Sequence, residues 1–128
     1  MNVVITGATG GVGSAVAKLF ASKGHNLILL GRNAKKPSDL GEYIGKNYKV
    51  SVHFYKCDAE KRAEVSNCIK DINELSKKIS LLINIAGFFP YGPLSKESES
   101  AFDNCMDVNL KLPYLLPLGL FSSLKKNG

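Results

Sequence analysis

The chain has 128 residues, 45% of them hydrophobic and 22% charged, which excludes a disordered or collagen-like polypeptide and suits one globular domain over residues 1–128. Its net charge of +6 comes from basic residues spread along the chain in short pairs, which argues against nucleic-acid binding. Three cysteines without a C-x-x-C pair indicate neither a disulfide framework nor a metal site.

The amino-acid sequence shows neither a targeting signal nor a membrane-spanning segment. No segment approaches the roughly 20 apolar residues of a membrane span, and the chain enters a short strand without a charged and then apolar leader. We therefore expect no membrane partner and a cytoplasmic location in which Cys57, Cys68 and Cys105 are reduced.

The first thirty residues predict a strand, a helix and a second strand. Residues 2–6 are an apolar strand, and the run Thr6-Gly7-Ala8-Thr9-Gly10-Gly11-Val12-Gly13 follows it. Apolar residues at helical spacing then continue to Phe20, and Gly24 is placed to end that helix. Residues 26–30 form a nearly continuous apolar run, which is typical of a parallel strand covered on both faces.

The remaining residues continue the alternation. A short helix interrupted by glycine is expected over 37–48, a third strand over 50–54, and a helix whose apolar stripe covers 65–75, with Asp58 placed to cap it. Residues 81–86 are the most apolar strand, which predicts a central position. A final helix from about Ser98 contains Pro113 and Pro117, which should bend it.

This alternation predicts an α/β fold: a doubly wound, Rossmann-type parallel sheet of about four strands in the order 3-2-1-4. The sheet is expected to be incomplete, because no further strand follows to pair with residues 81–86. That edge would be apolar and open, so we expect a second copy, a companion chain or the C-terminal helix to cover it.

The glycine run between the first strand and the first helix indicates a phosphate-binding turn. Glycine permits positive φ and close approach of the backbone to a ligand, and the following helix would direct its free N–H groups and positive dipole end at a pyrophosphate. The residues expected to form this part of a cofactor site are Gly7, Thr9, Gly10, Gly11, Val12 and Gly13.

Four separated motifs together resemble the short-chain dehydrogenase/reductase family, and the resemblance covers the whole chain. They are Thr6-Gly7-x-x-x-Gly11-x-Gly13, Cys57-Asp58-Ala59, Asn84-Ile85-Ala86-Gly87 and Val108-Asn109-Leu110. The glycines also fit the spacing of the extended, epimerase-like branch, but Asn84-x-Ala86-Gly87 resembles the N-N-A-G of the ordinary branch, with Ile85 in place of the second Asn. The resemblance implies an oxidoreductase that moves a hydride between a nicotinamide cofactor and an alcohol or carbonyl.

The end of the second strand favours NADP over NAD. Rossmann turns that bind NAD carry an acidic residue there for the ribose hydroxyls. This chain has Gly31, followed by Arg32 and Asn33. A guanidinium can bond a 2′-phosphate through two N–H groups, whereas a carboxylate would repel it. An exposed loop arginine without a ligand is the alternative.

The resemblance also implies roles for residues farther along the chain. Asp58 and Ala59 would face the adenine, and Asn84, Ala86 and Gly87 would line the cofactor's ribose side. Asn109 resembles the helix asparagine that holds a water in the family's proton relay, and it is the one member of the catalytic set that the chain contains. A polar group that satisfies the bent helix is an equal alternative for Asn109.

The family's catalytic Ser and Tyr-x-x-x-Lys are not found. None of the five tyrosines is followed four places on by lysine, and Ser122 and Ser123 fall at a helix end. Related enzymes use the tyrosinate as base, with its pKa lowered by the lysine. We therefore expect an NADP(H)-binding portion that is inactive alone; the alternative is a non-catalytic dinucleotide-binding sensor or partner subunit.

Overall fold

A computed structural model describes residues 1–33, 36–96 and 98–125 of the chain. Within these ranges a 3-10 turn (η1) and a π-helical turn (η2) accompany the helices and strands. In these ranges no helix is both long and apolar enough to cross a bilayer. The elements are β1 (Asn2–Thr6), α1 (Gly11–Ser22), β2 (Asn26–Gly31), α2 (Lys36–Asn47), β3 (Val52–Lys56), α3 (Arg62–Leu75), β4 (Leu81–Ile83), η1 (Leu94–Lys96), α4 (Glu99–Met106), η2 (Asp107–Lys111), α5 (Leu112–Gly119) and α6 (Phe121–Lys125).

The strands form one parallel sheet in the order β3-β2-β1-β4. The α/β fold and the strand order predicted from the sequence are therefore confirmed. This order places β4 at the sheet edge, as expected for an incomplete sheet, but the strand is shorter than the predicted 81–86 and pairs only over Leu81–Ile83. Beyond the paired residues, the backbone N–H groups of Ile85 and Ala86 donate to the Thr6 hydroxyl and not to the backbone of β1.

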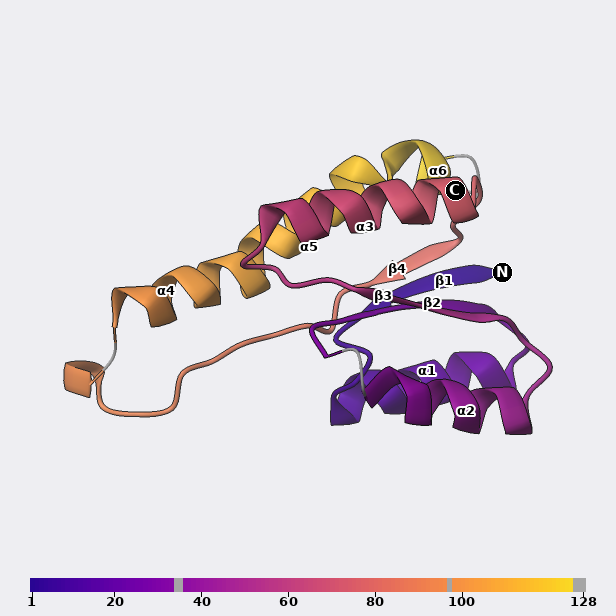
Figure 1. The fold of residues 1–128 in the computed structure, drawn as a ribbon, viewed down its shortest axis with the longest axis horizontal. Coiled ribbons are helices and arrows are strands. Elements are labelled where there is room, and N and C mark those ends of the chain that lie inside the picture. The colour runs from indigo at the N-terminus through magenta and orange to yellow at the C-terminus, as the bar shows by residue number, and fades with distance from the viewer. Residues whose placement is uncertain (34–35, 97, 126–128) are drawn as a thin grey trace.

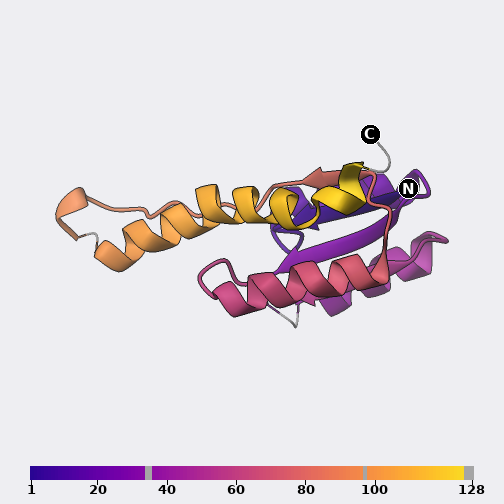
Figure 2. The same cartoon turned by 90° about the horizontal axis from the view of Figure 1, so that it is seen from above.

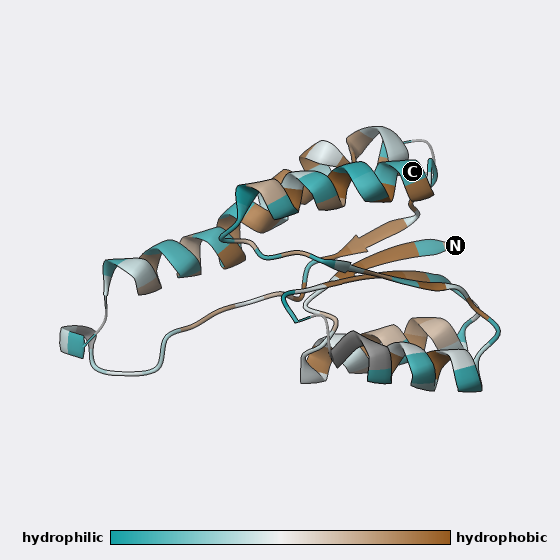
Figure 3. Cartoon of the chain, viewed as in Figure 1, coloured by the Kyte–Doolittle hydropathy of each residue, from teal (hydrophilic) through white to brown (hydrophobic). Residues whose placement is uncertain are grey.

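Helices cover both faces of the sheet. Figure 1 shows α1 and α2 on one face and α3, α5 and α6 on the other. Because strand side chains alternate between faces, Val4 packs toward α3 and α5, while Val3 and Ile5 pack toward α1 and α2. Two separate buried clusters result, and the strands between them are the most apolar part of the ribbon in Figure 3.

The C-terminal helix begins as predicted and is disturbed near its first proline. Ser98 caps α4, since its hydroxyl accepts a hydrogen bond of 3.2 Å from the N–H of Ala101. Pro113 has no N–H to offer the carbonyl four residues back. The N–H of Leu112 bonds instead to the carbonyl of Asp107, five residues back, which gives the π turn η2. The expected disturbance is thus a local change of helical register.

One part of the molecule reaches well beyond the sheet. Figure 2 shows the segment after β4 and helix α4 extending outward, while α5 and α6 return over the strands. Helix α4 buries none of its residues, in contrast to α5, which buries Leu112 and Leu116. The carboxyl ends of the strands lie at the base of this projection, and a pocket opens there.

Candidate functional site

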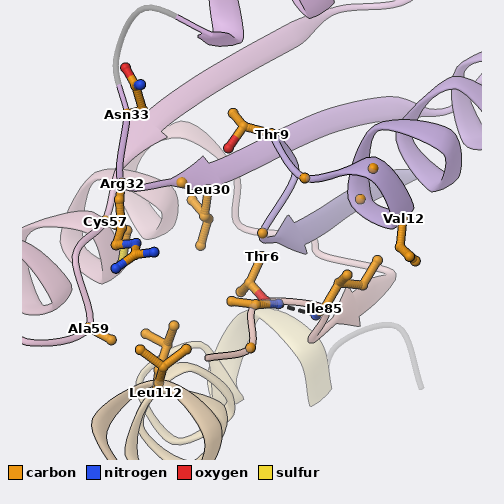
Figure 4. A pocket seen from close by; sticks show the side chains of 18 residues that line it. Thr6, Thr9, Val12, Leu30, Arg32, Asn33, Cys57, Ala59, Ile85 and Leu112 are labelled. Carbon is orange, nitrogen blue, oxygen red and sulfur yellow. Dashed lines mark hydrogen bonds between the residues drawn. The ribbon is translucent and has the colours of Figure 1, made fainter. Parts of the chain in front are cut away.

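A pocket of about 540 Å³ lies at the carboxyl ends of β1, β2 and β4. The chain runs from β1 through β2 to β3 on one side and then returns to place β4 on the other side of β1. Ligands of open α/β sheets bind at such a reversal of strand order, because the connections on either side separate and leave a crevice. Figure 4 shows the side chains that line it.

Two glycines give the first turn its shape. Gly7 has φ of 66°, and a Cβ there would lie 2.7 Å from the backbone nitrogen of Ala86. A Cβ on Gly13 would overlap the carbonyl oxygen of Gly7. Any larger residue at either position would therefore push the turn away from β4 or from helix α1. The turn is closed by a hydrogen bond of 3.0 Å from the N–H of Gly10 to the carbonyl of Gly7.

Helix α1 directs its amino end into the pocket. Its N-cap is Gly10, which supplies no side-chain hydrogen bond, and its first turn contains no acidic residue. The first N–H groups of a helix have no partner within the helix, and the dipole places partial positive charge there. Gly11, Val12 and Gly13 all line the pocket. These residues fit a pyrophosphate, because they offer backbone donors without a competing carboxylate.

The end of β2 forms the opposite wall. Leu30, Gly31, Arg32 and Asn33 line the pocket, with Gly31 buried and Arg32 exposed. Figure 4 shows the Arg32 side chain turned into the pocket. Thr9 lies close to this wall, since a Cβ on Gly31 would lie 3.3 Å from its hydroxyl oxygen. Arg32 and Thr9 both line the pocket at this wall, and the two residues that follow Gly31 are an arginine and an asparagine, with no carboxylate.

Thr6 joins the ends of β1 and β4 below the pocket. Its side chain is 1% exposed, and its hydroxyl oxygen accepts hydrogen bonds from the N–H groups of Ile85 at 3.0 Å and Ala86 at 3.1 Å. The bond to Ile85 is drawn in Figure 4. Because Ala86 and Gly87 line the pocket, this threonine fixes the wall that continues from β4.

Most of the predicted cofactor residues come together in the pocket. Two do not line it: Asp58 and Asn84. Asn84 is exposed, one residue beyond the paired part of β4, where alternation turns it away from the neighbouring Ile83 and Ile85. The other residues predicted to bind the cofactor all line the pocket, and they are Gly7, Thr9, Gly10, Gly11, Val12, Gly13, Arg32, Asn33, Ala59, Ala86 and Gly87.

Asp58 acts in the turn that precedes α3. The prediction that it caps the helix is wrong, because α3 begins at Arg62 and its N-cap is Lys61. The Asp58 carboxylate instead accepts a hydrogen bond of 3.2 Å from the N–H of Glu60. Its own N–H donates to Glu64, whose carboxylate also accepts from Lys56 at 3.2 Å. The hydrogen bond from Lys56 holds the pKa of Glu64 below its usual value.

Asn109 does not line the pocket; its side chain holds the backbone just beyond it. The side-chain carbonyl accepts from the N–H of Phe88 at 3.0 Å, and the amide donates to the carbonyl of Phe88 at 2.6 Å. The amide also donates to the sulfur of Cys105. Helix and loop are thus fastened next to Gly87. These bonds tie the helix to the loop and do not satisfy the backbone of the bent helix, as the alternative supposed. The role of Asn109 in a proton relay stays a prediction.

Sequence reasoning missed part of the lining. Leu112 lies one turn beyond Val108 of the fourth motif, and both line the pocket, which only the packing of that helix on the sheet could reveal. The others belong to the predicted motifs or adjoin them, and could have been found with them. They are Thr6, Leu30, Gly31, Cys57 and Ile85.

Proteins similar to this chain in sequence include oxidoreductases. A family model described as short chain dehydrogenase matches residues 1–128. An uncharacterized oxidoreductase of Thermotoga maritima is 34% identical over 98% of this chain and 49% of its own length. A 3-oxoacyl-(acyl-carrier-protein) reductase of Rickettsia typhi is 34% identical over 88% of this chain and 44% of its own. Each therefore extends over about twice the length matched.

Solved structures agree with the sequence matches. An alcohol dehydrogenase from the archaeon Thermococcus sibiricus, complexed with 5-hydroxy-NADP, has a TM-score of 0.91 and 26% identity, covering 98% of this chain and 54% of that one. A metagenomic short-chain oxidoreductase in complex with NADP has a TM-score of 0.84 and 25% identity, over 99% and 56%. The family model matches from the first residue to the last. The chain therefore belongs to the short-chain dehydrogenase family of oxidoreductases.

Proposed function

We propose that this chain is the NADP(H)-binding portion of an oxidoreductase that transfers a hydride between NADP(H) and an alcohol or carbonyl. The observation that carries the proposal is Arg32, which is turned into the pocket directly after a glycine at the end of β2. When bound, the nicotinamide cofactor supplies or accepts the hydride. Similar proteins in complex with NADP support this choice of cofactor.

The residues of the pocket divide into three parts along an extended dinucleotide. The N–H groups at the start of α1 would hold the pyrophosphate. Arg32, with Thr9 and Asn33, would hold the 2′-phosphate, and Ala59 with Asp58 nearby would face the adenine. Ala86 and Gly87 would leave room for the ribose, with Asn84 at the adjoining strand end. Asn109 would act on this wall through the backbone of Phe88.

Selectivity for NADP follows from the charge at the end of β2. A charge-assisted hydrogen bond from Arg32 to a 2′-phosphate is worth about 1.5–3 kcal/mol, roughly ten- to a hundredfold in affinity. NADH lacks that phosphate and would not make the bond. The arginine is exposed, so the lower half of this range is expected at physiological ionic strength because of screening by salt.

Isothermal titration calorimetry with NADPH and NADH tests the proposal. Arg32→Ala should weaken NADPH binding about tenfold and leave NADH binding unchanged. Arg62 is the matched control, since it is the second of the two arginines in the chain and begins α3 without lining the pocket. Arg62→Ala removes the same charge and should leave both affinities unchanged. Equal affinities for the two dinucleotides in the unsubstituted protein would contradict the proposal.

We also propose that this chain alone does not turn over. Its 128 residues contain no tyrosine followed four places on by lysine, so the base that related enzymes use is not supplied by that motif. The second candidate function is a dinucleotide-binding sensor or partner subunit. An assay of NADPH consumption with simple aldehydes and ketones tests the inactivity: turnover by this chain alone would refute it, and NADPH binding without turnover would support it.

Self-association is part of the proposal, because the outer face of the C-terminal helix is apolar. Its exposed side chains follow one another by three or four residues from α4 to α6. Together they present roughly 600–700 Å² of apolar surface, near the 800 Å² that each partner contributes to a standard interface. They are Phe102, Met106, Leu110, Tyr114, Leu118 and Phe121.

A second copy fits this surface when the two helices run antiparallel. Glu99 and Asp103 lie at the start of the helical region and Lys125 at its end. An antiparallel pair sets the acidic end of one copy against the basic end of the other, which a two-fold axis allows. Leu110→Glu should convert a dimer in light scattering to a monomer. A monomer before substitution would contradict the proposal, and a dimer that survives Leu110→Glu would favour the open edge of β4.

We place the protein in the cytoplasm. All three cysteines are free thiols, and Cys57 and Cys68 are buried among apolar side chains. Free buried thiols are typical of a reducing compartment. Fluorescence microscopy of the tagged protein in its own cell tests this assignment, and signal confined to another compartment would contradict it.

A further inference from the structure

Two cysteines that the proposed function does not use lie together behind the pocket. Cys57 directly follows β3 and Cys68 lies within α3, and their side chains are 4% and 2% exposed. Both belong to the same buried cluster, together with Val65 of α3. Cys57 also lines the pocket, and Figure 4 shows it at the wall. One thiol is therefore reached through the pocket, and the other lies behind it.

The two thiols have unequal acidity. A hydrogen bond from Cys68 lowers the pKa of Cys57, although burial and the carboxylates of Glu64 and Asp58 oppose this effect. The same hydrogen bond, together with burial, raises the pKa of Cys68. The thiolate is the reactive form of cysteine. Cys57 is thus the thiol that reacts first, and the Cys68 thiol, in the same buried cluster, is the one to follow.

We propose that Cys57 and Cys68 are an oxidisable thiol pair, and that a ligand in the pocket protects it from hydroperoxides. Paired cysteines with this division of roles are found in redox-sensing proteins. Disulfides in reducing compartments are mostly transient and regulatory. The protection by ligand rests on the proposed function, because it requires a dinucleotide in the pocket. The reaction of the two thiols does not.

The chemistry consists of two steps with a hydroperoxide as the two-electron oxidant. The Cys57 thiolate attacks one peroxide oxygen, the O–O bond breaks, and the sulfur becomes a sulfenic acid while the other oxygen leaves as alkoxide or hydroxide and takes a proton. The Cys68 sulfur then attacks the sulfenic sulfur. The S–S bond forms, and the hydroxyl leaves with the thiol proton as water. A dithiol such as dithiothreitol reverses the reaction.

Peptide mass spectrometry after treatment with hydrogen peroxide tests the pair. Trypsin cleaves after Lys61 and Arg62, so Cys57 and Cys68 fall on different peptides. The unsubstituted protein without ligand should give those peptides linked, with the loss of two hydrogens, and dithiothreitol should separate them. Cys68→Ser should leave Cys57 as a sulfenic acid that dimedone traps. Unlinked peptides with Cys57 still reduced would overturn the proposal.

Cys105 is the matched control. It is less buried than the pair, and its sulfur contacts the backbone of Phe88 and the amide of Asn109. Cys105→Ser should therefore leave the linked peptides unchanged, whereas Cys57→Ser should abolish them. Circular dichroism melting of each variant shows that it is folded. Linked peptides that require Cys105 would show that exposure rather than the buried contact determines the reaction, and would overturn the proposal.

Oxidised NADP⁺ tests the protection, since it does not consume peroxide. At one hundred times its dissociation constant only about 1% of the pocket is empty, so disulfide formation should slow about a hundredfold. If calorimetry shows that the sample binds NADP⁺ and the rate of disulfide formation is nevertheless unchanged, the protection is refuted. If calorimetry shows no binding, the proposed function fails, while the disulfide found without ligand still supports the thiol pair.

Discussion

Replacing the Thr6 hydroxyl by a methyl group tests how the ends of β1 and β4 are held together. Thr6→Val keeps the volume of the side chain and removes the oxygen that accepts from the N–H groups of Ile85 and Ala86. An unpaired buried donor costs about 1–3 kcal/mol. Both bonds are only partly buried, so the low end applies to each, and we expect a loss of about 2 kcal/mol in the free energy of unfolding.

This loss is measured by thermal and urea unfolding, with circular dichroism as the signal. For a domain of this size, about 2 kcal/mol lowers the melting temperature by roughly 6–10 °C. Thr6→Ser retains the acceptor and should recover most of the stability. Thr9→Val makes the same chemical change beside Gly31 in the pocket and should cost under about 0.5 kcal/mol. If the Thr6→Val and Thr9→Val proteins have the same melting temperature, the Thr6 hydroxyl does not hold the two strands together and the reasoning is refuted.

Gly31→Asp should reverse the cofactor preference, because a carboxylate repels a 2′-phosphate and accepts from ribose hydroxyls; calorimetry that still finds NADPH preferred would contradict it. Glu64→Gln should lower the melting temperature at pH 7. Lys56 lowers the pKa of this carboxyl in the folded state, so its stabilisation is present above the usual glutamate pKa of about 4.3 and is lost as the pH falls through the lowered value; a difference between the proteins that persists at pH 2 would refute this. Asn109→Ala should increase the rate of hydrogen exchange at the N–H of Phe88, because that N–H donates to the Asn109 side chain. The same exchange rate in both proteins would show that other contacts hold the loop.

The sequence predicted the parts of the fold that are determined locally. The glycine spacing of residues 7–13 and the apolar runs of β1 and β2 led to the correct turn, sheet and strand order. Predictions from these features are correct because a phosphate-binding turn needs glycine at fixed positions and a buried parallel strand needs apolar residues on both faces.

What the sequence could not predict depends on contacts between distant segments. The Thr6 hydroxyl meets residues 79 and 80 positions away, and no local pattern reports such a bond. Pro113 predicted a disturbance, but its form as the π turn η2 depends on how the helix lies on the sheet. Asp58 is a residue type that often caps helices, yet its carboxylate accepts a hydrogen bond from the N–H two residues ahead, in a turn before the helix. The side-chain type alone does not decide between a helix cap and such a turn.

The division of the buried core by the sheet has a consequence for cooperativity. The cluster under α1 and α2 and the cluster under α3 and α5 share no side chains, so substitutions in one should combine additively with substitutions in the other. The pocket is lined both by Val108 and Leu112 of one cluster and by Ile85, which packs against the other. A bound ligand would contact both layers, so its occupancy should couple substitutions in one cluster to substitutions in the other.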